Sequence, residues 1–177
     1  MKLGLKRNQV KLSQYSNEWE QEFIIIKQEL LNVFPLLQDR IEHIGSTAIK
    51  GMTAKPILDL AVGVDDINKV DNTVLKAFKA AGFLRLRVVR PNEIVLAKFT
   101  DETYEEKTHY LHVVDYNEDL WKNFLFFRDY LNANKTARDN YINLKNEFIQ
   151  NYPDAGIEQY TDFKVQFVNE ISSKRKA

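Results

Sequence analysis

Residues 43–59 (HIGSTAIKGMTAKPILD) constrain the fold of this chain more than any other stretch. They leave one strand-like segment at a Gly-Ser turn, cross a loop of small residues and enter a second strand that carries Asp59 near its start. A Gly-Ser turn can present backbone N–H groups and a hydroxyl to a phosphate, and a nearby carboxylate can hold the accompanying metal ion. The run therefore predicts two neighbouring strands around a phosphate- and metal-binding cleft, with Ser46 and Asp59 as candidate catalytic residues.

The second strand, residues 57–64 (ILDLAVGV), is almost entirely apolar, which is typical of a buried strand. Because side chains alternate between the two faces of a strand, Leu58 shares one face with other large apolar residues, whereas Asp59 shares the opposite face with Ala61 and Gly63. We expect the first face to join the core and the second to leave room for a ligand. The alternative is that Asp59 acts as a cap or pairs with a neighbouring lysine or arginine.

Gly45, Ser46 and Thr47 are the expected phosphate cradle. Their loop is not a P-loop, because Gly51 is not followed by lysine. Lys55, at the entry to the second strand, is placed to reach a phosphate, and a solvated lysine at a strand end is an equal alternative.

Two of the three histidines, His43 and His112, are further candidates for ligand binding. His43 immediately precedes the turn. His109 and His112 lie on one predicted strand and face opposite sides of it unless a bulge intervenes. A neutral histidine can ligate a metal or orient a substrate, although a strand histidine more often packs in the core.

The C-terminal part carries basic residues beside apolar positions of its predicted helices. Arg128, Arg138, Lys145 and Lys164 have this placement. As a group they could face the cleft and bind phosphates, and Arg128, Lys145 and Lys164 are the candidates we retain. For each of them alone, a charge on a solvated helix face is the alternative.

The remaining pattern predicts an α+β fold. Helical spacing of apolar residues predicts helices over residues 17–34 and 66–82, and from residue 117 onward. Strands are expected at residues 40–44, 57–64, 83–89, 93–99 and 109–116. We therefore expect a single domain over residues 1–177. Residues 1–116 would form mainly a mixed, strongly twisted sheet with helices on one face, and residues 117–177 a helical subdomain.

Composition limits the classes of partner. Lysine and arginine number 25, as do aspartate and glutamate, so the formal net charge is zero. No overall basic field attracts extended nucleic acid, and a nucleotide or other small phosphate-bearing molecule is the expected partner. The absence of cysteine excludes disulfides, catalytic thiols and thiolate zinc sites.

Residues 1–16 lack a secretory h-region and no apolar run has membrane-spanning length, so we expect a cytoplasmic protein without a membrane partner. The oligomeric state stays open.

From residue 10 to residue 171 the chain resembles the GrpB-like family. The matching elements are residues 43–48, 51, 54–59, 111–114, 121, 127–131, 141, 144–145, 160 and 164. The resemblance implies a nucleotidyltransferase-type fold of the DNA polymerase β-like superfamily. In some bacteria a similar domain is fused to dephospho-CoA kinase, which implies a link to nucleotide or coenzyme A metabolism.

One position departs from the pattern of active nucleotidyltransferases. Those enzymes carry a second carboxylate two residues after the first, where this chain reads Asp59-Leu60-Ala61. A two-metal mechanism would need another ligand, for which Glu42, Glu93 or His112 are available.

Three functions follow from these residues. The first is Mg²⁺-dependent transfer of a nucleotidyl group from a nucleoside triphosphate to a small acceptor, with the ion on Asp59. The second is a non-catalytic module that binds a nucleotide or a ligand related to coenzyme A, which Ala61 favours. The third is an interaction domain with a vestigial cleft.

Overall fold

A mixed sheet runs through the structure, a computed structural model that describes residues 2–175. The strands lie in the order β2-β3-β6-β5-β4, and β1 pairs with the start of β6. Their bounds are Leu5–Lys6 (β1), Ile41–Ile44 (β2), Leu58–Val64 (β3), Leu84–Arg85 (β4), Ile94–Phe99 (β5) and Glu106–Asp115 (β6). The pair β3 and β6 is parallel and the other described pairs are antiparallel. Ile44 lies opposite Asp59, so the two strands around the Gly-Ser turn are neighbours, as predicted.

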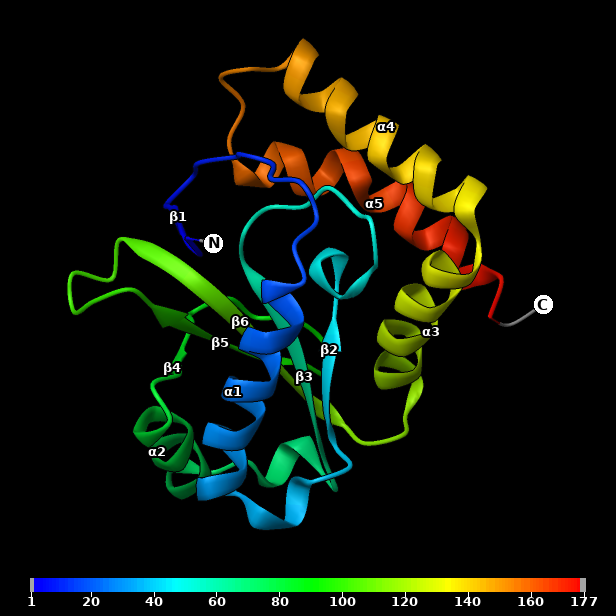
Figure 1. Cartoon of the computed structure of the whole chain (residues 1–177). Coiled ribbons are helices and arrows are strands. Elements are labelled where there is room, and N and C mark those ends of the chain that lie inside the picture. The colour runs from blue at the N-terminus through cyan, green and yellow to red at the C-terminus, as the bar shows by residue number, and fades with distance from the viewer. Residues whose placement is uncertain (1, 176–177) are drawn as a thin grey trace.

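One face of the sheet carries the main core. Leu58, Leu60 and Val62 of β3 are fully buried on this face. They pack under α1 (Glu18–Val33) and α2 (Asn72–Ala80), which lie together on that side of the sheet (Figure 1). The period-two alternation of β3 thus assigned its core face correctly.

The segment predicted as one helix over residues 66–82 is interrupted. Asp66 caps only a 3₁₀ turn, Ile67–Lys69, and α2 begins after Asp71. The Asp71 carboxylate accepts hydrogen bonds from the N–H groups of Thr73 and Val74. Each aspartate satisfies the free N–H groups of its own turn, so two short elements replace one helix.

Two strands also differ in length from the prediction. The strand expected over residues 83–89 pairs only at β4, because Val89 beyond it is 93% exposed and buries no face against the sheet. Conversely, β6 begins at Glu106 rather than at residue 109, because β1 pairs with its first residues.

The C-terminal part is helical, as predicted. It consists of α3 (Asp119–Ala133), α4 (Lys135–Asn151) and α5 (Ile157–Ser173), which lie together beside the sheet (Figure 1). Ile49 and Met52, from the loop after the Gly-Ser turn, are fully buried among these helices. The loop therefore ties the sheet to the helical part. Within residues 2–175, none of the helices combines the length and the apolar character that crossing a membrane requires.

Candidate functional site

The predicted turn at Gly45 lies directly against Asp59. Gly45 has a φ of 68°, in the left-handed region that favours glycine. A Cβ built on Gly45 would lie 2.5 Å from Asp59 Oδ2. Both the backbone conformation and the closeness of the carboxylate therefore require glycine here. The following residues, Ser46–Ala48, form a single 3₁₀ turn (η2).

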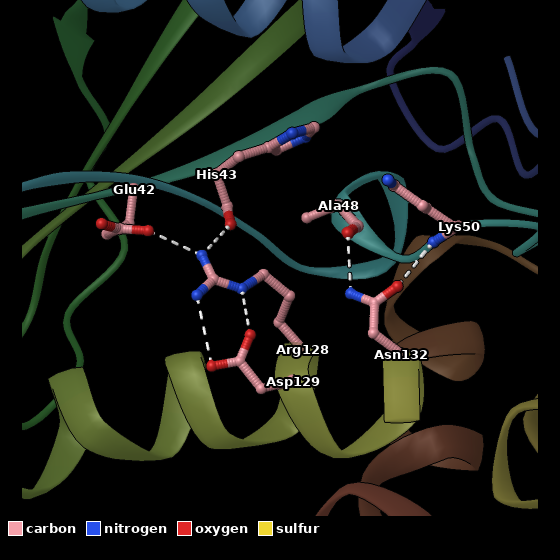
Figure 2. A network of polar contacts seen from close by, with 7 residues as sticks. All are labelled: Glu42, His43, Ala48, Lys50, Arg128, Asp129 and Asn132. Atoms are coloured by element: carbon pink, nitrogen blue, oxygen red, sulfur yellow. Dashed lines mark hydrogen bonds and ion pairs between the residues drawn. The ribbon is translucent and has the colours of Figure 1, made fainter. Parts of the chain in front are cut away.

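Arg128 of α3 holds the strand that leads into this turn (Figure 2). Its Nη1 donates to the His43 carbonyl at 3.0 Å and to Glu42 Oε2 at 2.7 Å. Arg128 does not line the cavity that contains Asp59; it lines a neighbouring recess, which shares Thr47 with that cavity. The expectation that it lines the Asp59 cleft is therefore wrong, and its contacts fit a residue that positions β2.

Asn132, one helical turn further along α3, holds the other end of the turn (Figure 2). Its Nδ2 donates to the Ala48 carbonyl at 3.2 Å, and its Oδ1 accepts from the Lys50 N–H at 2.9 Å. Contacts from one helix thus bracket η2 on both sides. The position of Ser46 relative to Asp59 depends on α3 as well as on the sheet.

A cavity of about 440 Å³ opens beside η2. It is lined from the turn, from β3 and β6, from the loop before β3 and from α5. The residues predicted for the ligand site that line it are Ser46, Thr47, Lys55, Asp59, His112 and Lys164. Segments far apart in the sequence therefore bring these side chains to one place, and their role in binding stays a prediction.

Asp59, His112 and Glu93 form a chain of charged contacts at the wall of the cavity. His112 Nε2 lies 3.5 Å from Asp59 Oδ1, and its Nδ1 contacts Glu93 Oε1. Burial opposes the charge of the imidazole, but hydrogen bonds and charges from both carboxylates outweigh it and raise the pKa of His112 to about 9. Burial alone would raise the pKa of Asp59, yet the His112 contact, followed by Lys55, lowers it. Asp59 is thus an ionised carboxylate beside an imidazolium.

The small residues that follow Asp59 on its face do not leave room for a ligand. Ala61 is fully buried in a cluster with Trp121 of α3. A Cβ on Gly63 would lie 2.6 Å from the Tyr116 ring. The Tyr116 ring occupies the space beside Gly63, and an apolar cluster encloses Ala61, so the expectation that these positions leave room for a ligand is wrong.

This packing also bears on the predicted metal site. The alternative ligands for a second ion are already engaged, Glu42 by Arg128 and Glu93 by His112. Among residues 2–175, no group of three or more acidic or histidine side chains could hold a metal ion. The donor set does not fit two ions. Asp59 is the carboxylate of this set that lines the cavity, and it too contacts His112.

Lys55 and Lys164 share the cavity with Tyr160. Lys164 Nζ lies 4.1 Å from the centre of the Tyr160 ring, and Lys55 Nζ lies 5.5 Å from it. Burial, followed by the charge of Lys55, lowers the pKa of Lys164 to about 7, although Asp59 opposes the shift. Burial likewise lowers the pKa of Lys55. An anion in the cavity would relieve this repulsion and favour both charged forms.

Lys145 lies behind the cavity instead of lining it. Its side chain is fully buried, with Nζ donating to the Thr53 carbonyl and lying 4.5 Å from the centre of the Tyr141 ring. Burial, followed by the charge of Lys164, lowers the pKa of Lys145 to about 7. The structure therefore separates Lys145 from the cavity wall at which it was expected.

The two remaining histidines are packing residues. His43 stacks on Phe23 with ring centres 5.1 Å apart, and its Nε2 is hydrogen-bonded to Thr47 Oγ1 at 2.9 Å. Burial lowers the pKa of His43 to about 4, so it supports the turn as a neutral ring. His109 lies on the core face, beside Phe83, as its offset from His112 along the strand predicted.

Sequence reasoning missed the aromatic residues of the site. Tyr160 lies in the cavity wall, and Ser46 is close enough to Tyr141 to lower its pKa against the larger effect of burial. Tyr160 and Lys164 are four residues apart and so share one helix face, which was a usable signal. Nothing local in the sequence connects Tyr141 with Ser46.

Comparison with known proteins identifies the family. The model of the family described as GrpB protein matches residues 9–174. The chain belongs to the GrpB family. Its relatives include the glutamate-rich protein GrpB of Alkalihalophilus pseudofirmus, 41% identical over 170 residues that cover 96% of this chain and 97% of the relative. A UPF0157 protein of Streptomyces coelicolor is 31% identical over 174 residues, covering 98% of this chain and 88% of the relative.

Solved structures place the GrpB chain among nucleotidyltransferase folds. The crystal structure of conserved protein GrpB from Enterococcus faecalis has a TM-score of 0.79 and 27% identity, covering 93% of this chain and 96% of that one. The Cid1 poly(U) polymerase, solved with MgGTP bound, has a TM-score of 0.52 and 14% identity, covering 77% of this chain and 44% of that one. The second likeness shows the fold alone and confirms the fold type that the GrpB resemblance implied.

Proposed function

We propose that the cavity beside Asp59 binds a nucleoside triphosphate or a related phosphate-bearing ligand. The observation that carries the proposal is that one cavity is lined both by Ser46 and Thr47 of η2 and by two basic side chains, Lys55 and Lys164. Hydroxyls and N–H groups of a tight turn, together with lysine ammonium groups, are suited to phosphate oxygens.

The charge balance of the cavity supports an anionic ligand. Its basic side chains are Lys55, Arg90, Lys107 and Lys164, and its acidic ones are Asp59, Glu158 and Asp162. The imidazolium of His112 is balanced by the carboxylate of Glu93, which it contacts. The wall is therefore net positive although the chain as a whole is formally neutral.

A single Mg²⁺ belongs to this proposal as a companion of the ligand. Asp59 would be its protein ligand, and phosphate oxygens and water would complete the shell. When bound, such an ion would supply Lewis-acid stabilisation of the phosphate charge. Lys55 and Lys164 would neutralise phosphate charge from the same cavity, and α3 keeps the turn in position.

Isothermal titration calorimetry with ATP, GTP, CTP and UTP, each with and without Mg²⁺, tests the proposal. Lys164→Met should weaken the tightest of these interactions at least tenfold, about 1.4 kcal/mol, because a charge-assisted contact is lost. Lys76→Met is the matched control, an exposed lysine of α2 outside the cavity. Absence of binding for all four nucleotides would contradict the proposal, as would equal losses in the two variants.

One observation favours binding without transfer as the function. Ala61 stands where the second carboxylate of an active nucleotidyltransferase would be, and it is fully buried in the apolar cluster that contains Trp121. Without a second ion the acceptor hydroxyl lacks the Lewis acid that would lower its pKa. Incubation with α-labelled nucleotides and small hydroxyl acceptors should therefore give binding but no labelled adduct, whereas robust adduct formation would establish transfer instead.

A further inference from the structure

A second, smaller recess adjoins the cavity and carries only basic charge. It encloses about 150 Å³ beside β1 and the start of β6. Its charged lining residues are Lys6, Arg7, Lys55 and Lys107, and no acidic side chain lines it among residues 2–175. A concave surface with four basic groups and no carboxylate is suited to a phosphate.

The N-terminal segment that forms one wall of the recess is held in a defined turn. Leu5 pairs with Lys107 across β1 and β6. The Gln9 N–H donates to the Lys6 carbonyl at 3.1 Å, and Asn8 adopts a φ of 63° to close the turn. The Arg7 N–H donates to the Glu105 carbonyl at 3.1 Å. Backbone contacts on both sides therefore fix where the Lys6 and Arg7 side chains begin.

The recess and the cavity share a wall. Lys55, Lys107 and Tyr110 line both of them, so the recess and the cavity are adjacent at these side chains. The basic groups also repel one another. Burial and then the charge of Arg7 lower the pKa of Lys107, and Lys107 in turn contributes to lowering the pKa of Lys55. A bound anion would remove this repulsion.

We propose that the recess binds a second phosphate group of the ligand, so that the preferred ligand is a nucleotide with a phosphate remote from its main phosphate chain. The assignment rests on the proposed function, in which the cavity beside Asp59 holds the main chain. Lys6 and Arg7 line the recess but not the cavity. They would therefore distinguish a nucleotide that carries the remote phosphate from one that lacks it.

Calorimetry with matched ligands tests this assignment. The probes are adenosine 5′-diphosphate and the same compound with an added 3′-phosphate, and the corresponding pair built on uridine. For at least one base, the 3′-phosphorylated compound should bind the wild-type protein at least tenfold more tightly. The combined variant Lys6→Gln/Arg7→Gln should lose that preference and keep its affinity for the simple diphosphate. Lys11 is an exposed residue of the same segment that lines neither the recess nor the cavity, so Lys11→Gln should keep the preference.

The outcomes separate the two proposals. If the simple diphosphates bind and the added phosphate brings no gain, the second subsite is wrong and the proposed function stands. If none of the four compounds binds although one of the nucleoside triphosphates does, the second subsite is wrong; if no nucleoside triphosphate binds either, the proposed function fails. Tighter binding of single-stranded oligoadenylate or oligouridylate than of the 3′-phosphorylated nucleotides would overturn the assignment to a small ligand. The comparison on wild-type protein decides the matter even if the combined variant does not fold.

Discussion

Replacing Lys145 by methionine should stabilise the protein at neutral pH. Lys145 is fully buried, and its polar contact is the Thr53 carbonyl. A lysine whose pKa is about 7 in the fold, against an ordinary 10.5, costs the folded state about 4 kcal/mol at pH 7. The hydrogen bond and the contact with the Tyr141 ring each stabilise the folded state by about 1 kcal/mol, and methionine would lose both. The expected net gain is therefore about 2 kcal/mol, a rise in Tm of about 4–8 °C for a chain of this size.

The effect has a definite pH dependence. Between pH 7 and pH 10.5 the unfolded chain holds a proton on Lys145 that the folded protein has released. Because the unfolded state binds more protons in this window, the free energy of unfolding of the wild type rises with pH. Lys145→Met removes that contribution, so its advantage should shrink steadily from pH 7 towards pH 10. Lys164, whose pKa is also about 7, contributes its own slope to both proteins.

Urea unfolding at pH 7 and at pH 10, followed by tryptophan fluorescence, measures this difference. Lys76→Met, at an exposed position of α2, controls for the loss of a surface lysine and should change the free energy of unfolding by less than about 0.5 kcal/mol. The reasoning fails if Lys145→Met is less stable than the wild type at pH 7 by an amount that does not vary with pH. That result would mean that Lys145 stays charged in the folded protein and that its contacts stabilise the charge.

Two further substitutions test the site. Gly45→Ala should destabilise the fold by about 2–4 kcal/mol in urea unfolding, because it combines a left-handed φ with a Cβ 2.5 Å from Asp59 Oδ2. Gly51→Ala, at φ 75° with no atom within 4 Å of the added Cβ, should cost only about 1–2 kcal/mol, and equal losses would refute the clash. Ala61→Asp should lower the free energy of unfolding by about 3 kcal/mol or more by burying a carboxylate under Trp121, and unchanged stability with a new Mn²⁺ signal would contradict this.

The sequence predicted those features that depend on neighbouring residues. Period-two alternation placed Asp59 and Leu58 on opposite faces, and the Gly-Ser turn placed Ser46 beside Asp59. The GrpB resemblance supplied the fold type, which periodicity alone could not.

Features that depend on distant contacts were not accessible. Helical spacing could place Lys145 and Arg128 beside apolar positions, but not name the surface that each would meet. Arg128 meets the backbone of β2, and Lys145 meets the loop at Thr53. Gly63 is small because the Tyr116 ring lies against it, more than fifty residues further along the chain. The size of a residue in one strand cannot reveal which distant ring lies against it.

The most direct test of a phosphate site beside Asp59 is a crystal structure with a non-hydrolysable nucleoside triphosphate analogue and Mn²⁺. The account predicts triphosphate density against Ser46 and Thr47, with Lys55 and Lys164 on its oxygens and one anomalous peak beside Asp59. An empty cavity in crystals that hold the analogue elsewhere would contradict the proposed site. Two anomalous peaks beside Asp59 would contradict the proposal of a single ion.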